Sequence, residues 1–118
     1  MRAVTDDLGV PAWLPVPDVA ERLGVPVTRV RQLVREGALI ALRPGGGPLQ
    51  VPAEFVAGGE VLKGLPGLIT VLRDGGFDDA EAVRWLYTPD DSLPGTPVQA
   101  LVADRGTEVK RRAQAMAF

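Results

Sequence analysis

The clearest pattern of hydrophobic and polar positions lies between residues 27 and 37, VTRVRQLVREG. On a helix that turns about 100° per residue, its apolar side chains share one arc and its polar side chains share the other. The apolar arc holds Val27, Val30, Leu33 and Val34; the polar arc holds Thr28, Arg31, Gln32 and Arg35, with Arg29 and Glu36 at its flank. The pattern predicts an amphipathic helix over residues 26–36 that ends at Gly37.

A shorter helix is predicted just before it, within PVPDVAERLG. Pro17 suits the first helical position, and Asp18 suits the first turn, where the helix dipole favours an acid. Gly24 ends this helix, and Val25 and Pro26 turn the chain into the next one. The two helices are therefore separated by a short turn that contains glycine.

A β-hairpin is predicted after the second helix. Two short apolar stretches, Leu39–Arg43 and Leu49–Val51, flank a run of proline and glycine at residues 44–48. A phosphate-binding loop does not fit this run, because no Lys-Ser or Lys-Thr follows it.

The rest of the chain reads as helical. A short turn is expected at Ala53–Val56, a helix from Pro66 to a stop at Gly75 and Gly76, and a last helix from Thr107 onward. Two further helices begin with capping-box patterns, Asp78 with Glu81 and Thr96 with Gln99. The expected core residues of this part are Trp85, Leu86, Tyr87 and Leu93, and in the last helix Val109, Ala113 and Met116 recur at three to four residues.

This order of elements predicts a mainly α fold, a winged helix-turn-helix followed by a helical part. Residues 1–15 show no periodicity and are expected to form a flexible tail, anchored by Trp13 and Leu14. Residues 16–57 would be the DNA-binding region, and residues 58–118 a helical region packed on it.

Composition narrows the chemistry. The 118 residues include no cysteine and no histidine, which excludes thiol catalysis, a Ser-His-Asp triad and the usual zinc sites. Adjacent acids, as at Asp78 and Asp79 or at Asp90 and Asp91, are more often helix caps than catalytic pairs. We expect no enzyme, no metal and no cofactor. No apolar run is long enough to span a membrane and the N-terminus is acidic, so a cytoplasmic location is expected.

Charge is distributed unevenly around a net charge of -2. Residues 16–51 contain five arginines and three acids, whereas residues 52–95 contain eight acids and three bases. A net acidic protein is not the usual nucleic-acid binder, because phosphate neutralisation supplies most of that affinity. Any DNA binding must therefore come from a local patch.

The segment VPDVAERLGVPVTRVRQLVREGALIALR resembles the helix-turn-helix of excisionase-like and MerR-like DNA-binding proteins. The stretches LKGLPGLITVLRDGGFDDAEAVRWLYTPDDSL and RRAQAMAF extend the likeness to a small actinobacterial family of winged helix-turn-helix proteins, known from a mycobacterial member that is a Ser/Thr-kinase substrate. This resemblance implies double-stranded DNA binding and transcriptional regulation. It also makes Thr5, in the N-terminal tail, a candidate phosphorylation site for such a kinase.

In this reading, the helix over 26–36 enters the major groove, and the wing at 39–51 meets the adjacent backbone or minor groove. Arg31 and Arg35 would donate to guanine or to phosphate, and Gln32 would pair with adenine. Thr28 lies near the helix N-terminus, where phosphate contacts are favoured. Arg29 and Arg43 would hold the DNA backbone.

A second hypothesis is a protein-interaction adaptor. The segment WLYTPDDSLPGTPVQALVADRGTEVKRRAQ is similar to the C-terminal module of some antitoxins. The acidic segment at residues 52–95 would repel DNA and could suit a basic partner. The C-terminal helices would then bind a protein partner or form a homodimer.

Overall fold

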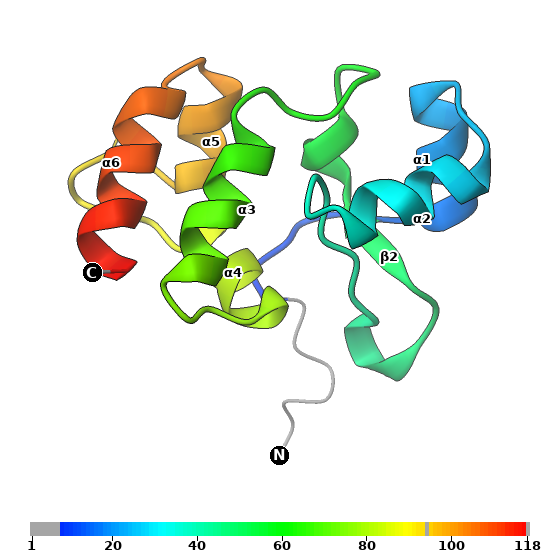
Figure 1. The fold of residues 1–118 in the computed structure, drawn as a ribbon, viewed down its shortest axis with the longest axis horizontal. Helices are drawn as coiled ribbons and strands as arrows, with labels where there is room; N and C mark the ends of the chain where they lie inside the picture. Colours follow the sequence, from blue (N-terminus) through cyan, green and yellow to red (C-terminus); the bar gives the residue numbers. More distant parts are fainter. Residues whose placement is uncertain (1–7, 94, 118) are drawn as a thin grey trace.

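The computed structural model describes residues 8–93 and 95–117. The N-terminal part contains β1 (Trp13–Pro15), α1 (Val16–Leu23), α2 (Val27–Arg35) and β2 (Gln50–Pro52), with 3-10 turns at Pro44–Gly46 and Ala53–Val56. The C-terminal part contains α3 (Leu65–Asp74), α4 (Asp79–Leu86), α5 (Pro97–Val102) and α6 (Gly106–Ala117). Figure 1 shows the two parts side by side, with the wing projecting below α2. The mainly α, winged helix-turn-helix fold is confirmed.

The helix-turn-helix follows its sequence signals closely. Gly24 adopts a left-handed conformation at φ 69°, and its N–H donates to carbonyls of the last turn of α1. Pro17 lies one position later than predicted, because α1 begins at Val16. The predicted helix over 26–36 corresponds to α2, with Pro26 and Glu36 as its two caps.

The end of the predicted tail is held in place through Trp13 and Leu14, the two residues expected to anchor it. Trp13–Pro15 form β1, which pairs antiparallel with β2 so that Leu14 lies opposite Val51. Further back, Val10 is buried at 2% exposure. The backbone of a short apolar strand can pair in this way with the free edge of another strand, here β2. Pro15, which has no N–H to donate, is tolerated because it is the last residue of the strand. Residues 1–7 lie outside the described part of the chain.

The wing is anchored differently from a simple hairpin. Its two arms are joined by a single antiparallel bridge, in which Leu42 and Gln50 exchange backbone hydrogen bonds of 2.9 and 2.7 Å. Leu39–Ala41 do not extend the ladder, and their side chains are buried in the core. β2 takes β1 as its partner instead, so the return arm of the wing is fixed from the N-terminal side.

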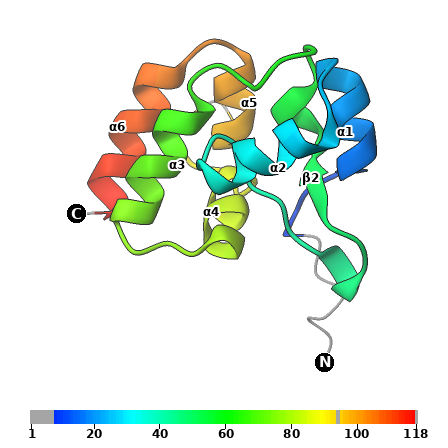
Figure 2. The same ribbon diagram turned by 45° about the vertical axis from the view of Figure 1, so that its right-hand side comes forward.

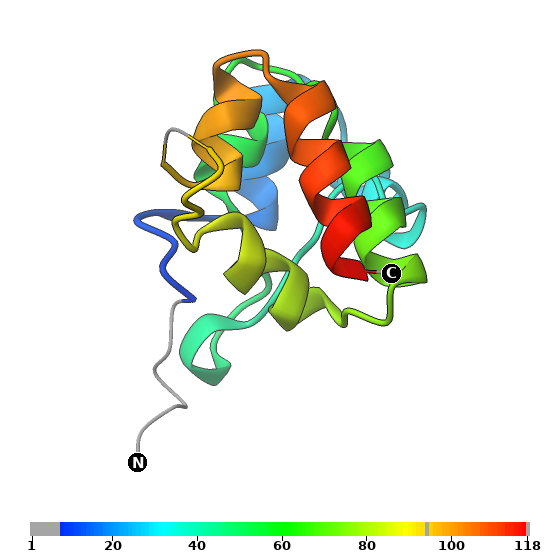
Figure 3. The same cartoon turned by 90° about the vertical axis from the view of Figure 1, so that its left-hand side faces the viewer.

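The C-terminal helices begin and end where local signals predict. Both capping boxes are formed: Asp78 and Glu81 exchange hydrogen bonds of 2.8 and 2.9 Å, and Thr96 and Gln99 exchange hydrogen bonds of 2.9 and 3.2 Å. α6 lies alongside α3 (Figure 3). The apolar residues that recur along α6 differ in burial. Val109 and Ala113 are buried, but Met116 is 47% exposed because no later element of the described chain covers that last turn.

An aromatic contact joins the two parts. Phe55, fully buried in the 3-10 turn after β2, stacks on Tyr87 at the end of α4 with ring centroids 6.4 Å apart. Burial, and then the nearby Glu54 carboxylate, raise the pKa of Tyr87 and keep its phenol protonated. The hydroxyl itself makes no hydrogen bond of good geometry within the described residues.

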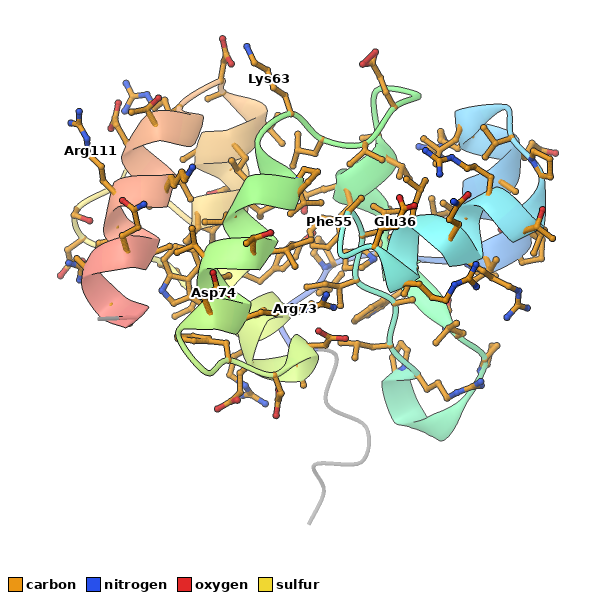
Figure 4. All side chains as sticks on the ribbon, viewed as in Figure 1. Glu36, Phe55, Lys63, Arg73, Asp74 and Arg111 are labelled. Atoms are coloured by element: carbon orange, nitrogen blue, oxygen red, sulfur yellow. The ribbon has the colours of Figure 1, made fainter. Side chains whose placement is uncertain are left out.

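A second contact joins the parts where α2 ends. Arg73 of α3 binds Asp79 of α4 through two hydrogen bonds, of 2.8 and 3.2 Å, to the same carboxylate oxygen. Its remaining terminal nitrogen lies against Gly37, where an added Cβ would be only 2.9 Å away. Figure 4 shows Arg73 at this seam. Gly37 has φ +80°, so it is required both by the backbone turn and by the close approach of Arg73.

We predict that Gly37→Ala is more destabilising than Gly24→Ala. Both glycines follow a helix in the left-handed region, which costs alanine roughly 1–2 kcal/mol, but a Cβ at Gly24 would meet no atom within 4 Å. Displacing Arg73 should add several tenths of a kcal/mol to the Gly37 variant, typical of a partly exposed ion pair. The measurement is the free energy of unfolding in urea. In an Arg73→Ala background, the two substitutions should become equal, and an unchanged difference would contradict the contact.

The turn before α5 is tied to α6 by one carboxylate. Asp90 accepts hydrogen bonds from the backbone N–H and the hydroxyl of Ser92, at 2.8 and 2.6 Å, and from Arg112 Nε at 2.9 Å. The Ser92 hydrogen bonds, and then Arg112, lower the pKa of Asp90 from 3.8 to about 2. The ionised form is therefore favoured in the folded state.

This shift predicts an acid-dependent contribution to stability. Because the pKa of Asp90 is lower in the folded than in the unfolded chain, its contribution is fully present above about pH 4 and is lost as the pH falls toward 2. The Asp90 carboxyl carbon, followed by NMR, should titrate near pH 2. Asp90→Asn should remove that part of the acid dependence, whereas Asp91→Asn, at a position without these bonds, should not. A titration midpoint at 3.8 or above would refute the shift.

Candidate nucleic-acid interface

The rotation of α2 is set by its buried face. Val30 is fully buried, and Val27, Leu33 and Val34 are half-buried against the core. The opposite face exposes Thr28, Arg31, Gln32 and Arg35, as the periodicity predicts. Arg31 and Arg35 make no hydrogen bond or ion pair with any described residue.

These two arginines border a shallow hollow between α2 and the wing. Its other lining residues are Val16 at the start of α1, Val34 on α2 and Leu49 on the return arm of the wing. Figure 2 shows the wing projecting beyond α2. The hollow therefore has an apolar floor between two cationic side chains.

A second set of side chains on α2 bond to one another. Arg29 Nη1 donates to Gln32 Oε1 at 2.9 Å and lies 3.7 Å from Glu36 Oε1. Residues three and seven positions apart lie on the same stripe of a helix, which brings these three together. Arg29, predicted to hold the DNA backbone, is thus engaged within its own helix, and it offsets the charge of Glu36.

The wing carries the remaining predicted arginine. Arg43 is exposed and its Nη1 makes a long hydrogen bond, 3.4 Å, to the Gly47 carbonyl across the tip. Gly45 and Gly46 both have positive φ, which only glycine adopts easily. This turn holds the Arg43 side chain at the base of the projecting tip.

The start of α2 completes the surface. Pro26 precedes the helix, and no side chain caps its first turn. The Arg29 N–H donates to the Pro26 carbonyl at 3.0 Å, so it is the N–H groups of Val27 and Thr28 that face an anion bound near Thr28. Thr5, the candidate phosphorylation site, lies outside the described residues.

A separate group of basic residues lies on the C-terminal part. Figure 4 shows Arg111 beside α6, at the far side of the molecule from Glu36, and Lys63 at the top, near the start of α3. Several members are paired: Lys63 with Asp104 at 3.3 Å and Arg112 with Asp90 at 2.9 Å. The α2 surface and this group are therefore distinct patches.

Sequence reasoning missed two features of the interface. The Arg29–Gln32–Glu36 stripe was readable from spacing alone, since its members recur at three and four residues. The hollow was not readable, because Val16 and Leu49 are 33 positions apart in the sequence and meet only in the fold.

Comparison with known proteins identifies the family of the chain. A family described as "DNA-binding protein Rv2175c, wHTH domain" matches residues 3–56, and one described as "Rv2175c C-terminal domain of unknown function" matches residues 62–117. The curated "DNA-binding protein Rv2175c" of Mycobacterium tuberculosis is 50% identical, over 87% of this chain and 79% of that protein. The chain belongs to the Rv2175c family.

The fold agrees with this assignment. A structure described as "NMR structure of Rv2175c" superposes with a TM-score of 0.82 at 47% identity, covering 91% of this chain and 82% of that one. The actinobacterial family resemblance inferred from the sequence is therefore confirmed. Within the described ranges, no helix is long and apolar enough to cross a membrane.

Proposed function

We propose that this protein binds double-stranded DNA and regulates transcription, with α2 in the major groove. The observation that carries the proposal is the pair Arg31 and Arg35, exposed, unpaired among the described residues and one helical turn apart beside the wing. Membership of a family whose described domain is a DNA-binding winged helix-turn-helix supports it. The relative's printed description also favours binding over catalysis, in a chain that lacks histidine and cysteine.

The residues would divide the contacts by position. Arg31 and Arg35 have the forked donors that match guanine edges and phosphates. Thr28, in the uncapped first turn of α2, suits a backbone phosphate, and Arg43 suits the backbone or minor groove beside the wing. The acids of residues 52–95 come from other elements, mostly of the C-terminal part, so the net charge of -2 does not oppose binding at α2.

The experiment is a titration of fluorescent duplex DNA at several salt concentrations. Arg31→Glu/Arg35→Glu should weaken binding at least tenfold and flatten the salt dependence, because each lost phosphate contact reduces the slope of log K against log salt by about 0.9. Lys110→Glu/Arg111→Glu, with the same change of charge on the distant α6, is the matched control and should bind nearly as the unmodified protein does.

Both double variants replace exposed side chains, so their unfolding free energies should stay close to that of the unmodified protein. If both double variants bound as tightly as the unmodified protein, α2 would not be the interface. Equal weakening of both would show that only total charge matters.

The C-terminal helices supply a proposed contact with a second copy. Val102 at the end of α5 is 58% exposed and Met116 on α6 is 47% exposed, and they are the large hydrophobic residues that stand out on the described surface. Dimeric DNA-binding domains of this class bind two half-sites, which raises affinity without new contacts per copy. Kinase action on Thr5, and a cytoplasmic location, stay predictions from the sequence and the family resemblance.

We predict that Val102→Lys/Met116→Lys lowers the sedimentation coefficient at micromolar concentration while α2 still binds duplex DNA. Sedimentation velocity of the full chain is the measurement. A single monomeric species in the unmodified protein across that range would contradict the dimer. A partner of another kind, as in the adaptor hypothesis, would then be needed to account for this surface.

A further inference from the structure

The amide of Gln32 is oriented by its neighbour on α2. Its Oε1 accepts the 2.9 Å hydrogen bond from Arg29, and a guanidinium has donors only, so the oxygen and not the nitrogen must face Arg29. Glu36 lies 3.7 Å from the same Arg29 nitrogen and holds that side chain along the stripe. The Nε2 group of Gln32 is thereby left for an outside partner.

The outward polar groups in the middle of α2 are therefore all donors. Arg31 and Arg35 carry guanidinium groups without an acceptor, and Gln32 presents N–H groups while its oxygen is turned toward Arg29. The acid of this stripe, Glu36, is offset by Arg29. A surface of donors binds acceptors and discriminates against other donors.

Base edges in the major groove differ in this respect. Guanine presents two acceptors, O6 and N7, whereas adenine combines the N7 acceptor with the N6 amino donor. Bidentate reading of adenine needs the oxygen and the nitrogen of a glutamine to face the base together, and in this protein the 2.9 Å bond turns the oxygen toward Arg29.

Building on the proposed function, we propose that α2 is a guanine reader, and that Arg29 sets this preference by positioning Gln32. The target class is duplex DNA with guanines on adjacent or next-adjacent base pairs. The adenine pairing expected for Gln32 from its residue type alone is replaced by donation to a guanine or phosphate oxygen.

The spacing of Arg31 and Arg35 sets how many base pairs separate the two guanines. Arg31 and Arg35 are separated by four residues, about 6 Å along the helix, which is less than two base-pair steps of about 3.4 Å each. The hollow between them is floored by Val34 and Leu49. An amino group of adenine or cytosine placed there would lose its water without gaining a partner, which disfavours those bases between the guanines.

The experiment is selection from randomised duplexes with the full chain, followed by binding measurements on the enriched sequence. The unmodified protein should enrich two guanines within three base pairs. Replacing either guanine by 7-deazaguanine, which lacks the N7 acceptor, should weaken binding about tenfold, as expected for a lost bidentate contact. Gln32→Ala identifies which selected base lies next to Gln32.

Three substitutions test the role of Arg29. Arg29→Met frees the Gln32 amide to turn, so adenine should become accepted at the Gln32 position. Arg29→Lys, again a pure donor, should restore the guanine preference. Glu36→Gln keeps the bond between Arg29 and Gln32, so it should keep the preference while binding all duplexes more tightly, because one acid near the phosphates is removed.

The outcomes separate the two proposals. Selection of adenine next to Gln32 by the unmodified protein overturns the inference, and so does an Arg29→Met variant with unchanged preference. Salt-dependent binding without base preference, lost in Arg31→Glu/Arg35→Glu, also overturns it but leaves the proposed function standing. A protein that binds no duplex overturns both.

Discussion

The burial of Val30 is the constraint on which the rest of the interface depends. A surface helix buries one face. If the neighbouring residue were buried instead of Val30, every side chain would be rotated about the helix axis by about 100°. With Val30 fully buried, Arg31 and Arg35 must project from the opposite side. The hollow, the stripe through Arg29 and the exposure of Thr28 all follow from this rotation.

Burial of Val30 sets the rotation of α2 but not its position. The C-terminal part fixes the position of α2 relative to the rest of the molecule. Arg73 lies against Gly37 at the end of α2 and is itself held by Asp79. Phe55 and Tyr87 join the two parts through a buried aromatic contact. The winged helix-turn-helix therefore shares its core with the C-terminal helices, and a change at this seam reaches the DNA-binding surface through the end of α2.

Local signals in the sequence predicted the helices well, but they could not predict contacts between residues that are distant in the sequence. The periodicity of residues 27–36 and the capping boxes at Asp78 and Thr96 involve neighbours within one or two turns, so a single sequence contains them. The pairing of Leu14 with Val51 joins two three-residue strands too short for a recognisable pattern. Of the site, the exposed face of α2 was predictable, whereas the engagement of Arg29 was overlooked and the hollow needed the fold.

The pairing of Arg29 with Glu36 has a consequence for affinity as well as for base preference. It removes one cation from phosphate contact, so α2 and the wing offer Arg31, Arg35 and Arg43 as their principal cations. Because each phosphate contact contributes about 0.9 to the salt slope, such a surface implies a shallow slope and modest binding by one copy. A protein built in this way gains discrimination between bases at the expense of non-specific attraction. The proposed second copy on a neighbouring half-site would raise the affinity, and the exposed apolar residues of the C-terminal helices would then have a role in the same function.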